Sequence, residues 1–202
     1  FFDKDGKEIW ITPRNGGAPV KYAPGMSYDG DDFVKNTVEA LNYIYNNGAD
    51  INNAIKTASA DEVVTNISYV SRRTGGAGYD KRDKSIKWND KDGMKGRGKD
   101  FRRSPALLLF HEFGHRDRHK NASPNKQFDT KAYEKEYYSK PIKKDGYSFP
   151  NRGEQIATEE YENKAAEKLN TETDANEGER KIYTAPVFKE METPTSTTPK
   201  ND

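Results

Sequence analysis

Apolar residues recur at helical spacing in several stretches of the chain. Between residues 31 and 45 they fall on one face, which predicts an amphipathic helix capped by one of the aspartates at its start. An unbroken apolar run at 106–110 follows Ser104 and Pro105, residues that suit the N-cap and the first helical position. This run places its helix in the core. Further helices are predicted over residues 51–58, 129–139 and 153–169.

Strands are indicated by the β-branched and aromatic residues between these helices. Residues 7–12 and 62–72 carry such residues and are followed by turns rich in glycine. Residues 83–89 alternate Ile86 and Trp88 with polar neighbours, a pattern typical of a half-exposed strand. Together, these segments predict an α+β fold with a small sheet.

Length and composition favour one domain with an economical core. The chain has 202 residues, of which 32% are hydrophobic and 33% are charged. We expect the domain over residues 31–190, after an N-terminal arm or linker over 1–30 and before a disordered, Thr/Pro-rich tail over 191–202. The chain begins with Phe1 and not with Met, which suggests a fragment or a processed product. No apolar stretch approaches the ~20 residues that a membrane span needs.

The charge of the chain argues against a nucleic-acid partner. Its 34 basic and 33 acidic residues leave a net charge of +1, so no strong field attracts nucleic acid or a membrane surface. Residues 91–103 are basic, but aspartates are interspersed and no aromatic series accompanies them. We interpret this stretch as a solvated loop. The alternative is a non-enzymatic binding module in which the loop contacts an acidic partner.

One motif carries chemistry in its spacing, the sequence HEFGH at residues 111–115. Positions four apart share one face of a helix, so His111 and His115 can present two imidazoles to one metal ion, with Glu112 beside them. In such HExxH zinc sites the Glu is the general base for the water that the metal activates. The alternative is two surface histidines on an ordinary helix. The chain has three histidines and places two of them here, after its most apolar run, which favours one bound zinc per chain.

The third zinc ligand is predicted to be a carboxylate. The chain has no cysteine that could serve. His119 lies about 12 Å from His111 along a continuous helix, which is too far for both to bind one ion at ~2 Å. We therefore expect His119 at the helix end or on the surface.

The predicted helix over 153–169 can supply this carboxylate. We favour Glu159, with Glu160 as the second choice, because small residues nearby allow close packing. Asn163, one turn further on, is then placed to orient a ligand histidine. The carboxylates that this helix offers are Glu154, Glu159, Glu160 and Glu162.

Two further roles complete the predicted site. The oxyanion formed by attack on a carbonyl needs an electrophilic partner besides the metal, and Arg180 with Tyr183 can supply a guanidinium and a phenol. We assign an extended substrate to the segment Ile86, Lys87 and Trp88, acting as an edge strand; the alternative is an edge strand without this role. Other candidates for the electrophilic partner are Lys143, Tyr147 and Arg152.

Together these residues resemble the effector-type zinc metallopeptidases related to NleD. The resemblance implies a zincin-like domain of the gluzincin type that cuts a protein of a target cell. It also supports Glu159 or Glu160 as a ligand and Arg180 with Tyr183 as the electrophilic pair. Gly114 departs from the pattern, because family members usually carry a larger apolar residue there. The resemblance covers residues 80–185 and rests on Ile86 to Trp88, Ser104 to Ala106, the HEFGH motif, Glu159 with Glu160, and Arg180 with Tyr183.

Residues 22–34 are similar to segments at the carboxyl end of Rhs-type polymorphic toxins of bacteria. This similarity implies a secreted toxin domain that is delivered into a target cell and countered by an immunity protein. The sequence as a whole therefore predicts a zinc-dependent endopeptidase with Glu112 as its base. A further alternative is a protease that processes only its own precursor.

Overall fold

Helices and short strands alternate along the chain. The computed structural model describes residues 8–73, 77–96, 101–125, 127–144, 147–180 and 187–200. The helices are α1 (Asp32–Asn46), η1 (Ile51–Asn53), α2 (Ala54–Ser59), α3 (Pro105–Asn121), α4 (Thr130–Tyr137), α5 (Arg152–Ile156), η2 (Ala157–Glu162) and α6 (Asn163–Glu172). The strands are β1 (Ile9–Ile11), β2 (Val20–Tyr22), β3 (Thr65–Tyr69), β4 (Gly78–Asp80), β5 (Ser85–Trp88), β6 (Asp92–Lys95), β7 (Arg102–Arg103), β8 (Ile142–Lys144), β9 (Tyr147–Phe149) and β10 (Val187–Glu190). The predicted α+β class is confirmed.

A five-stranded sheet has the order β2-β1-β3-β5-β4. Strands β1, β3 and β5 are parallel, and β2 and β4 pair antiparallel at the two edges. Ile9 and Ile11 of β1 are fully buried and belong to the same core as the central helices. Residues 9–22 are therefore part of the domain, and the expectation of an arm or linker over 1–30 is wrong for them. Alternating isoleucines were the local sign of this burial.

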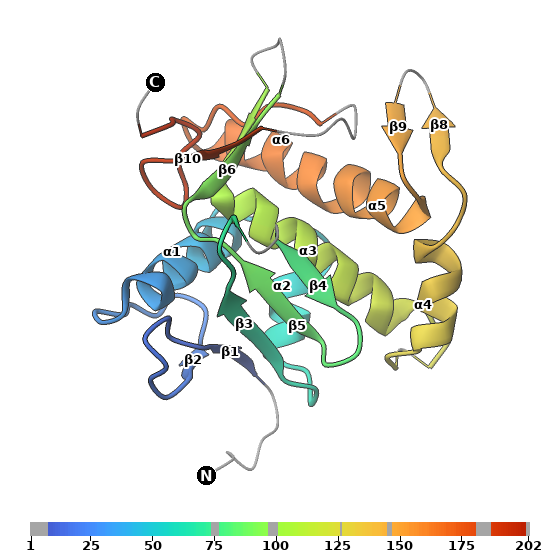
Figure 1. Ribbon diagram of the computed structural model, residues 1–202, viewed down its shortest axis with the longest axis horizontal. Coiled ribbons are helices and arrows are strands. Elements are labelled where there is room, and N and C mark those ends of the chain that lie inside the picture. The colour runs from blue at the N-terminus through green and yellow to red at the C-terminus, as the bar shows by residue number, and fades with distance from the viewer. Residues whose placement is uncertain are drawn as a thin grey trace.

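Helix α3 runs between this sheet and the long helical run of α5, η2 and α6 (Figure 1). Its start follows the prediction: the Ser104 hydroxyl accepts a hydrogen bond from the Leu107 N–H at 3.4 Å, and Pro105 stands in the first turn. The apolar run that follows is buried. Because neighbours enclose α3 on all sides, the HEFGH motif lies on a rigid support.

The end of the chain folds onto α3 in place of the predicted disordered tail. Strand β10 pairs antiparallel with β6, and Met191 forms a bridge with Pro199. Met191 is buried, and the Pro194 carbonyl accepts a hydrogen bond from the Ala106 N–H at 2.8 Å. A Thr/Pro-rich composition favours disorder, but three buried residues, Met191, Pro194 and Pro199, and these backbone bonds order residues 191–200.

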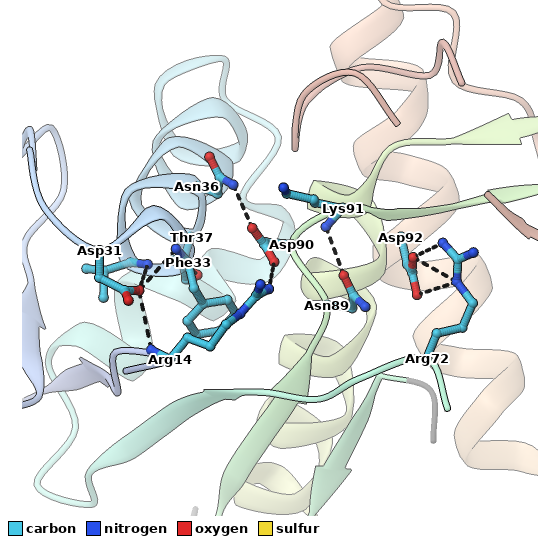
Figure 2. A network of polar contacts seen from close by, with 11 residues as sticks. Arg14, Asp31, Phe33, Asn36, Thr37, Arg72, Asn89, Asp90, Lys91 and Asp92 are labelled. Carbon is cyan, nitrogen blue, oxygen red and sulfur yellow. Dashed lines mark hydrogen bonds and ion pairs between the residues drawn. The ribbon is translucent and has the colours of Figure 1, made fainter. Parts of the chain in front are cut away.

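The turn after β5 is tied to the start of the chain and to α1, as Figure 2 shows. The Asp90 carboxylate is 1% exposed. It accepts hydrogen bonds from Arg14 Nη2 at 3.0 Å and from Asn36 Nδ2 at 2.6 Å. A buried charge is costly unless it is paired in this way, so these contacts fix how β5 enters the core.

The basic stretch over 91–103 contributes to a second sheet, of order β10-β6-β7. Arg103 is fully buried, and its Nε lies 3.1 Å from Oε1 of Glu162. The expectation of a solvated loop is therefore wrong for β6 and β7, because the counter-charge of Arg103 lies on a helix distant in sequence. Residues 97–100 lie outside the described residues.

The predicted helices agree well with the structure. Those over 31–45, 51–58 and 129–139 correspond to α1, α2 and α4, and Asp31 and Asp129 cap two of them. The helix predicted over 153–169 is present as the continuous run from α5 to α6, with the π-helix η2 in its middle. None of the helices in the described part of the chain has the length and apolar character to cross a membrane.

Candidate metal centre

Helix α3 brings two imidazoles together as the spacing predicts. His111 and His115 are both buried, and their Nε2 atoms lie 3.1 Å apart. Two ring nitrogens that face each other at this distance can bind one shared metal ion.

Glu154 of α5 supplies the third converging group. Its Oε2 lies 3.3 Å from Nε2 of His111, and its Oε1 lies 3.4 Å from Nε2 of His115. Tetrahedral zinc with bonds of about 2.0–2.1 Å holds its ligand atoms roughly 3.3 Å apart. The observed separations match that spacing, and Oε2 of Glu154 is buried without a hydrogen-bond donor in the described chain. The group of His111, His115 and Glu154 can therefore hold a metal ion.

This arrangement corrects the predicted ligand. Glu159 accepts a hydrogen bond from Gln155 Nε2 at 2.9 Å and does not join the histidines. Glu160 is exposed and pairs with Lys164 at 2.5 Å. The reason lies in where the helix begins: Asn151 caps it by accepting from the Glu154 N–H at 2.9 Å, so Glu154 is already in the first turn, opposite α3.

A π-helix brings a second carboxylate to the same histidine. Backbone bonds in a π-helix run from residue i to i+5, so each turn holds more residues than in an α-helix. Because of η2, the Glu162 side chain lies on the same face of this helical run as Glu154, which is two turns earlier, and that face is turned toward α3. Its Oε2 lies 2.9 Å from Nδ1 of His111. A carboxylate only accepts, so Nδ1 donates and Nε2 keeps its lone pair for a metal.

Two arginines hold Glu162 in place. Arg103 Nε lies 3.1 Å from its Oε1, and Arg180 Nη1 lies 3.0 Å from its Oε2. Glu162 and Arg103 are fully buried, and Arg180 is 5% exposed. The two cations hold the pKa of the Glu162 carboxyl well below its usual range despite burial, which alone would raise it.

The remaining predicted roles are distributed differently. Arg180 supports Glu162 behind His111 and does not face the Nε2 side, so it is not placed as the electrophilic partner. Glu162, and not Asn163, orients the ligand histidine; the Asn163 amide binds the side chain of Arg103 and the backbone of Arg180. Tyr183 lies outside the described residues. Among the alternatives, Arg152 bonds Gln155, Lys143 is exposed on β8, and the side chain of Tyr147 is not described.

Helix α4 supplies two tyrosines that the prediction missed. Tyr133 is buried, and its hydroxyl lies 3.1 Å from Nδ1 of His115. The Tyr137 hydroxyl donates to Oε1 of Glu154 at 3.4 Å. The sequence did hold a sign of this pair, because tyrosines four apart share one face of a predicted helix.

Gly114 of the motif allows the two ligand-bearing helices to approach closely. A Cβ at this position would lie 2.9 Å from Cγ of Tyr161 on η2. The Tyr161 hydroxyl donates to Asp117 of α3 on the other side of the contact. A larger residue at 114 would therefore push η2 away from α3.

Charge is concentrated around the converging atoms. Burial alone would lower the pKa of His111, but the adjacent carboxylates of Glu154 and Glu162 raise this pKa to about 10. For Glu154, burial would raise the pKa, but the two adjacent histidines bring it far below its usual range. The negative charge that favours a proton on His111 equally favours a cation. Burial raises the pKa of Glu112, which prepares it to accept a proton.

His119 lies outside this group, as helix geometry predicted, but not on the surface. It is fully buried. The Tyr79 hydroxyl lies 2.9 Å from its Nδ1, and the rings of Phe128 and Tyr133 pack against it. Burial lowers the pKa of His119 from 6.5 to about 4. Its polar neighbours are on β4 and α4, so its local sequence gave no sign of them.

The predicted substrate strand is not at an edge. β5 pairs with β3 on one side and β4 on the other, and Ile86 and Trp88 are fully buried. Of this segment, Lys87 alone is exposed. The outer strand next to α3 is β4, which begins at Gly78, the last residue of a glycine-rich stretch where the sequence predicts a turn.

Comparison with known proteins returned no match to any family model, curated protein or solved structure. The chemistry of this centre is therefore argued from its own residues.

Proposed function

We propose that the protein is a zinc-dependent endopeptidase with a zincin-like arrangement of its active-site helices. One observation carries the proposal: His111, His115 and Glu154 converge at the separations of a tetrahedral site, with Glu112 beside them on α3. Two His and one Glu, with a fourth position left for water, is the ligand set of hydrolytic zinc and not of structural zinc.

A zinc ion bound there supplies a Lewis acid that activates water and polarises the carbonyl of a peptide bond. Glu112 accepts the proton of the attacking water and then passes it to the leaving amine nitrogen. The burial of Glu112 suits both steps. It raises the pKa of the carboxyl group, which makes the carboxylate a better proton acceptor, and it keeps bulk water away. Glu162 and Tyr133 hold the two histidine rings in orientation from behind.

Tyr137 is the group best placed to stabilise the oxyanion in place of Arg180. Its hydroxyl lies at the third ligand, its ring is 5.5 Å from that of His115, and it is half-buried at the mouth of the centre. A phenol that turns from Glu154 to the developing oxyanion gains a charge-assisted hydrogen bond in the transition state.

The resemblance to delivered effectors and toxins also supports a proposal for the substrate, the location and the partner of the protein. The substrate is then a protein of a target cell, the chain is secreted or delivered, and an immunity protein is its partner. Self-processing is tested by mixing the active chain with a Glu112→Gln precursor and measuring cleavage of the latter.

The proposal is tested by metal content and by cleavage. Purified protein should contain about one zinc per chain, because the described residues hold one group of three possible ligands. Glu112→Gln should keep this zinc and lose Glu112-dependent cleavage of a proteome-derived peptide library, read by mass spectrometry of the new termini. Protein that binds no zinc, or a Glu112→Gln variant with full activity, contradicts the proposal.

A further inference from the structure

A groove between β4 and α4 opens beside the candidate metal centre. Its volume is about 510 Å³. Tyr133 and Tyr137, which contact His115 and Glu154, also line the groove, so the groove adjoins the centre. The lining residues that matter here are Gly78, Tyr79, Lys81, Lys87, Tyr137 and Tyr138.

One wall of the groove is a free strand edge. In the described part of the chain, β4 pairs with β5 on one side and with no strand on the other. The backbone N–H of Tyr79 lies within hydrogen-bonding reach of the Glu112 carboxylate, so this edge borders the catalytic base. Apart from this N–H, the unpaired edge offers its backbone groups to an extended chain, which adds as a further strand.

Most charges in and around the groove are already paired. Lys81 Nζ lies 2.6 Å from Oε1 of Glu134 and donates to the Tyr138 hydroxyl at 2.9 Å. Arg82 pairs with Asp80 at 2.9 Å. The contacts of Lys81 tie the turn after β4 to α4. Because these charges are paired, they leave no net charge for a ligand to bind.

Lys87 is the cation that remains. It is exposed and forms no ion pair with the described residues. Its register partner on β4 is Gly78, and side chains of paired residues lie on the same face of a sheet. Gly78 has no side chain, and the space beside its Cα is open. The ammonium group of Lys87 therefore has an unobstructed path across β4 to the free edge.

We propose that the groove binds an extended peptide whose Asp or Glu side chain pairs with Lys87. The backbone of the peptide adds to β4, and its carboxylate gives Lys87 an ion-pair partner. Asp80 of the groove also acts electrostatically on Lys87, but its carboxylate is already paired with Arg82. This inference rests on the proposed function in one respect, that the bound peptide is the substrate presented to the metal centre. It adds a class of substrate, an acidic extended segment, which the metal centre alone does not define.

Binding without turnover tests the inference. The zinc-loaded Glu112→Gln protein is titrated into two fluorescein-labelled peptides, one of alternating Glu and Thr and one of alternating Lys and Thr, and anisotropy is measured. The Glu peptide should bind about two- to fivefold more tightly, the range expected of one exposed ion pair. Adding Lys87→Met should abolish the preference, and Lys87→Glu should reverse it. Lys56→Glu, a matched change at an exposed position of α2, should leave it unaltered.

The outcomes separate this inference from the proposed function. Equal affinity for the two peptides, or a preference that survives Lys87→Glu, overturns the inference and leaves the zinc and Glu112 tests untouched. An acidic preference that Lys87→Glu reverses supports the groove. If the same protein with Glu112 intact then cleaves no peptide, the proposed function is overturned while the groove stands.

Discussion

The carboxylate of Glu162 accepts a hydrogen bond from Nδ1 of His111 at 2.9 Å, on the side of the ring away from the converging Nε2 atoms. This contact links the candidate metal centre to a buried ion cluster, because Arg103 and Arg180 bind the same carboxylate. The orientation of one ligand ring thus depends on strand β7 and on the segment after α6.

Replacing Glu162 by Gln should weaken both metal binding and folding. Loss of the partner that orients His111 should lower zinc affinity about 10–100-fold. Loss of the charge leaves two buried arginines uncompensated, at a cost of about 3–5 kcal/mol in unfolding free energy. Chelator competition and urea unfolding measure the two effects. Glu167→Gln, at an exposed position of α6, is the control and should change neither.

Glu154→Gln and Glu159→Gln distinguish the two candidates for the third ligand. The first removes an anionic ligand atom and should reduce zinc affinity by more than the roughly 100-fold upper range of an outer-shell change. The second removes an acceptor of Gln155 alone and should leave affinity within about twofold of the wild type. Zinc stoichiometry and competition with a chelator give the answer. The reverse ranking would restore Glu159 as the ligand.

Gly114→Ala should destabilise the protein because its Cβ meets the Tyr161 ring. The overlap should cost about 1–3 kcal/mol, against a gain of about 1 kcal/mol from helix propensity. In a Tyr161→Ala background the overlap is gone, so the same substitution should become stabilising. Thermal or urea unfolding of the four proteins measures this coupling. An equal effect of Gly114→Ala in both backgrounds would contradict the close contact.

The stability of the protein should fall as pH decreases from about 6.5 toward 4, partly through His119. Its pKa is lowered from 6.5 to about 4 in the folded state, so between these values the unfolded chain binds the proton more readily. The contribution is fully present above pH 6.5 and is lost as pH falls through 4. Urea unfolding at pH 5 and pH 7 should show a smaller difference in His119→Gln than in wild type. A difference of the same size in both proteins would rule out this role.

Helix α3 could be predicted because its determinants are local. Ser104, Pro105 and the apolar run define where α3 begins and that it is buried, and the spacing of the histidines then determines which face they share. The choice between Glu154 and Glu159 is not local. It depends on where α5 is capped and on the π-helix. The π-helix changes the direction in which each side chain after Ala157 points around the helix axis. A helical wheel assumes a regular α-helix and therefore does not include that change.

Contacts between segments distant in sequence account for most other differences. Arg103 looks like one of several loop cations until Glu162 is placed beside it. Met191 looks like part of a low-complexity tail until it is buried beside β6. Tyr133 and Tyr137 are a different case, since their spacing on a predicted helix was visible and could have marked a face turned toward the centre.

The hydrogen bond from the Ala106 N–H to the Pro194 carbonyl imposes an order on the biosynthesis of this domain. A ribosome makes α3 and the ligands on α5 well before it makes Pro194. Until then, one donor in the first turn of α3 has no protein acceptor, and β6 lacks its partner β10. The nascent chain therefore carries all three converging ligands before it has the contacts that hold their helix in place. We therefore expect the candidate metal centre to reach its final geometry only after the segment that contains Pro194 has been made.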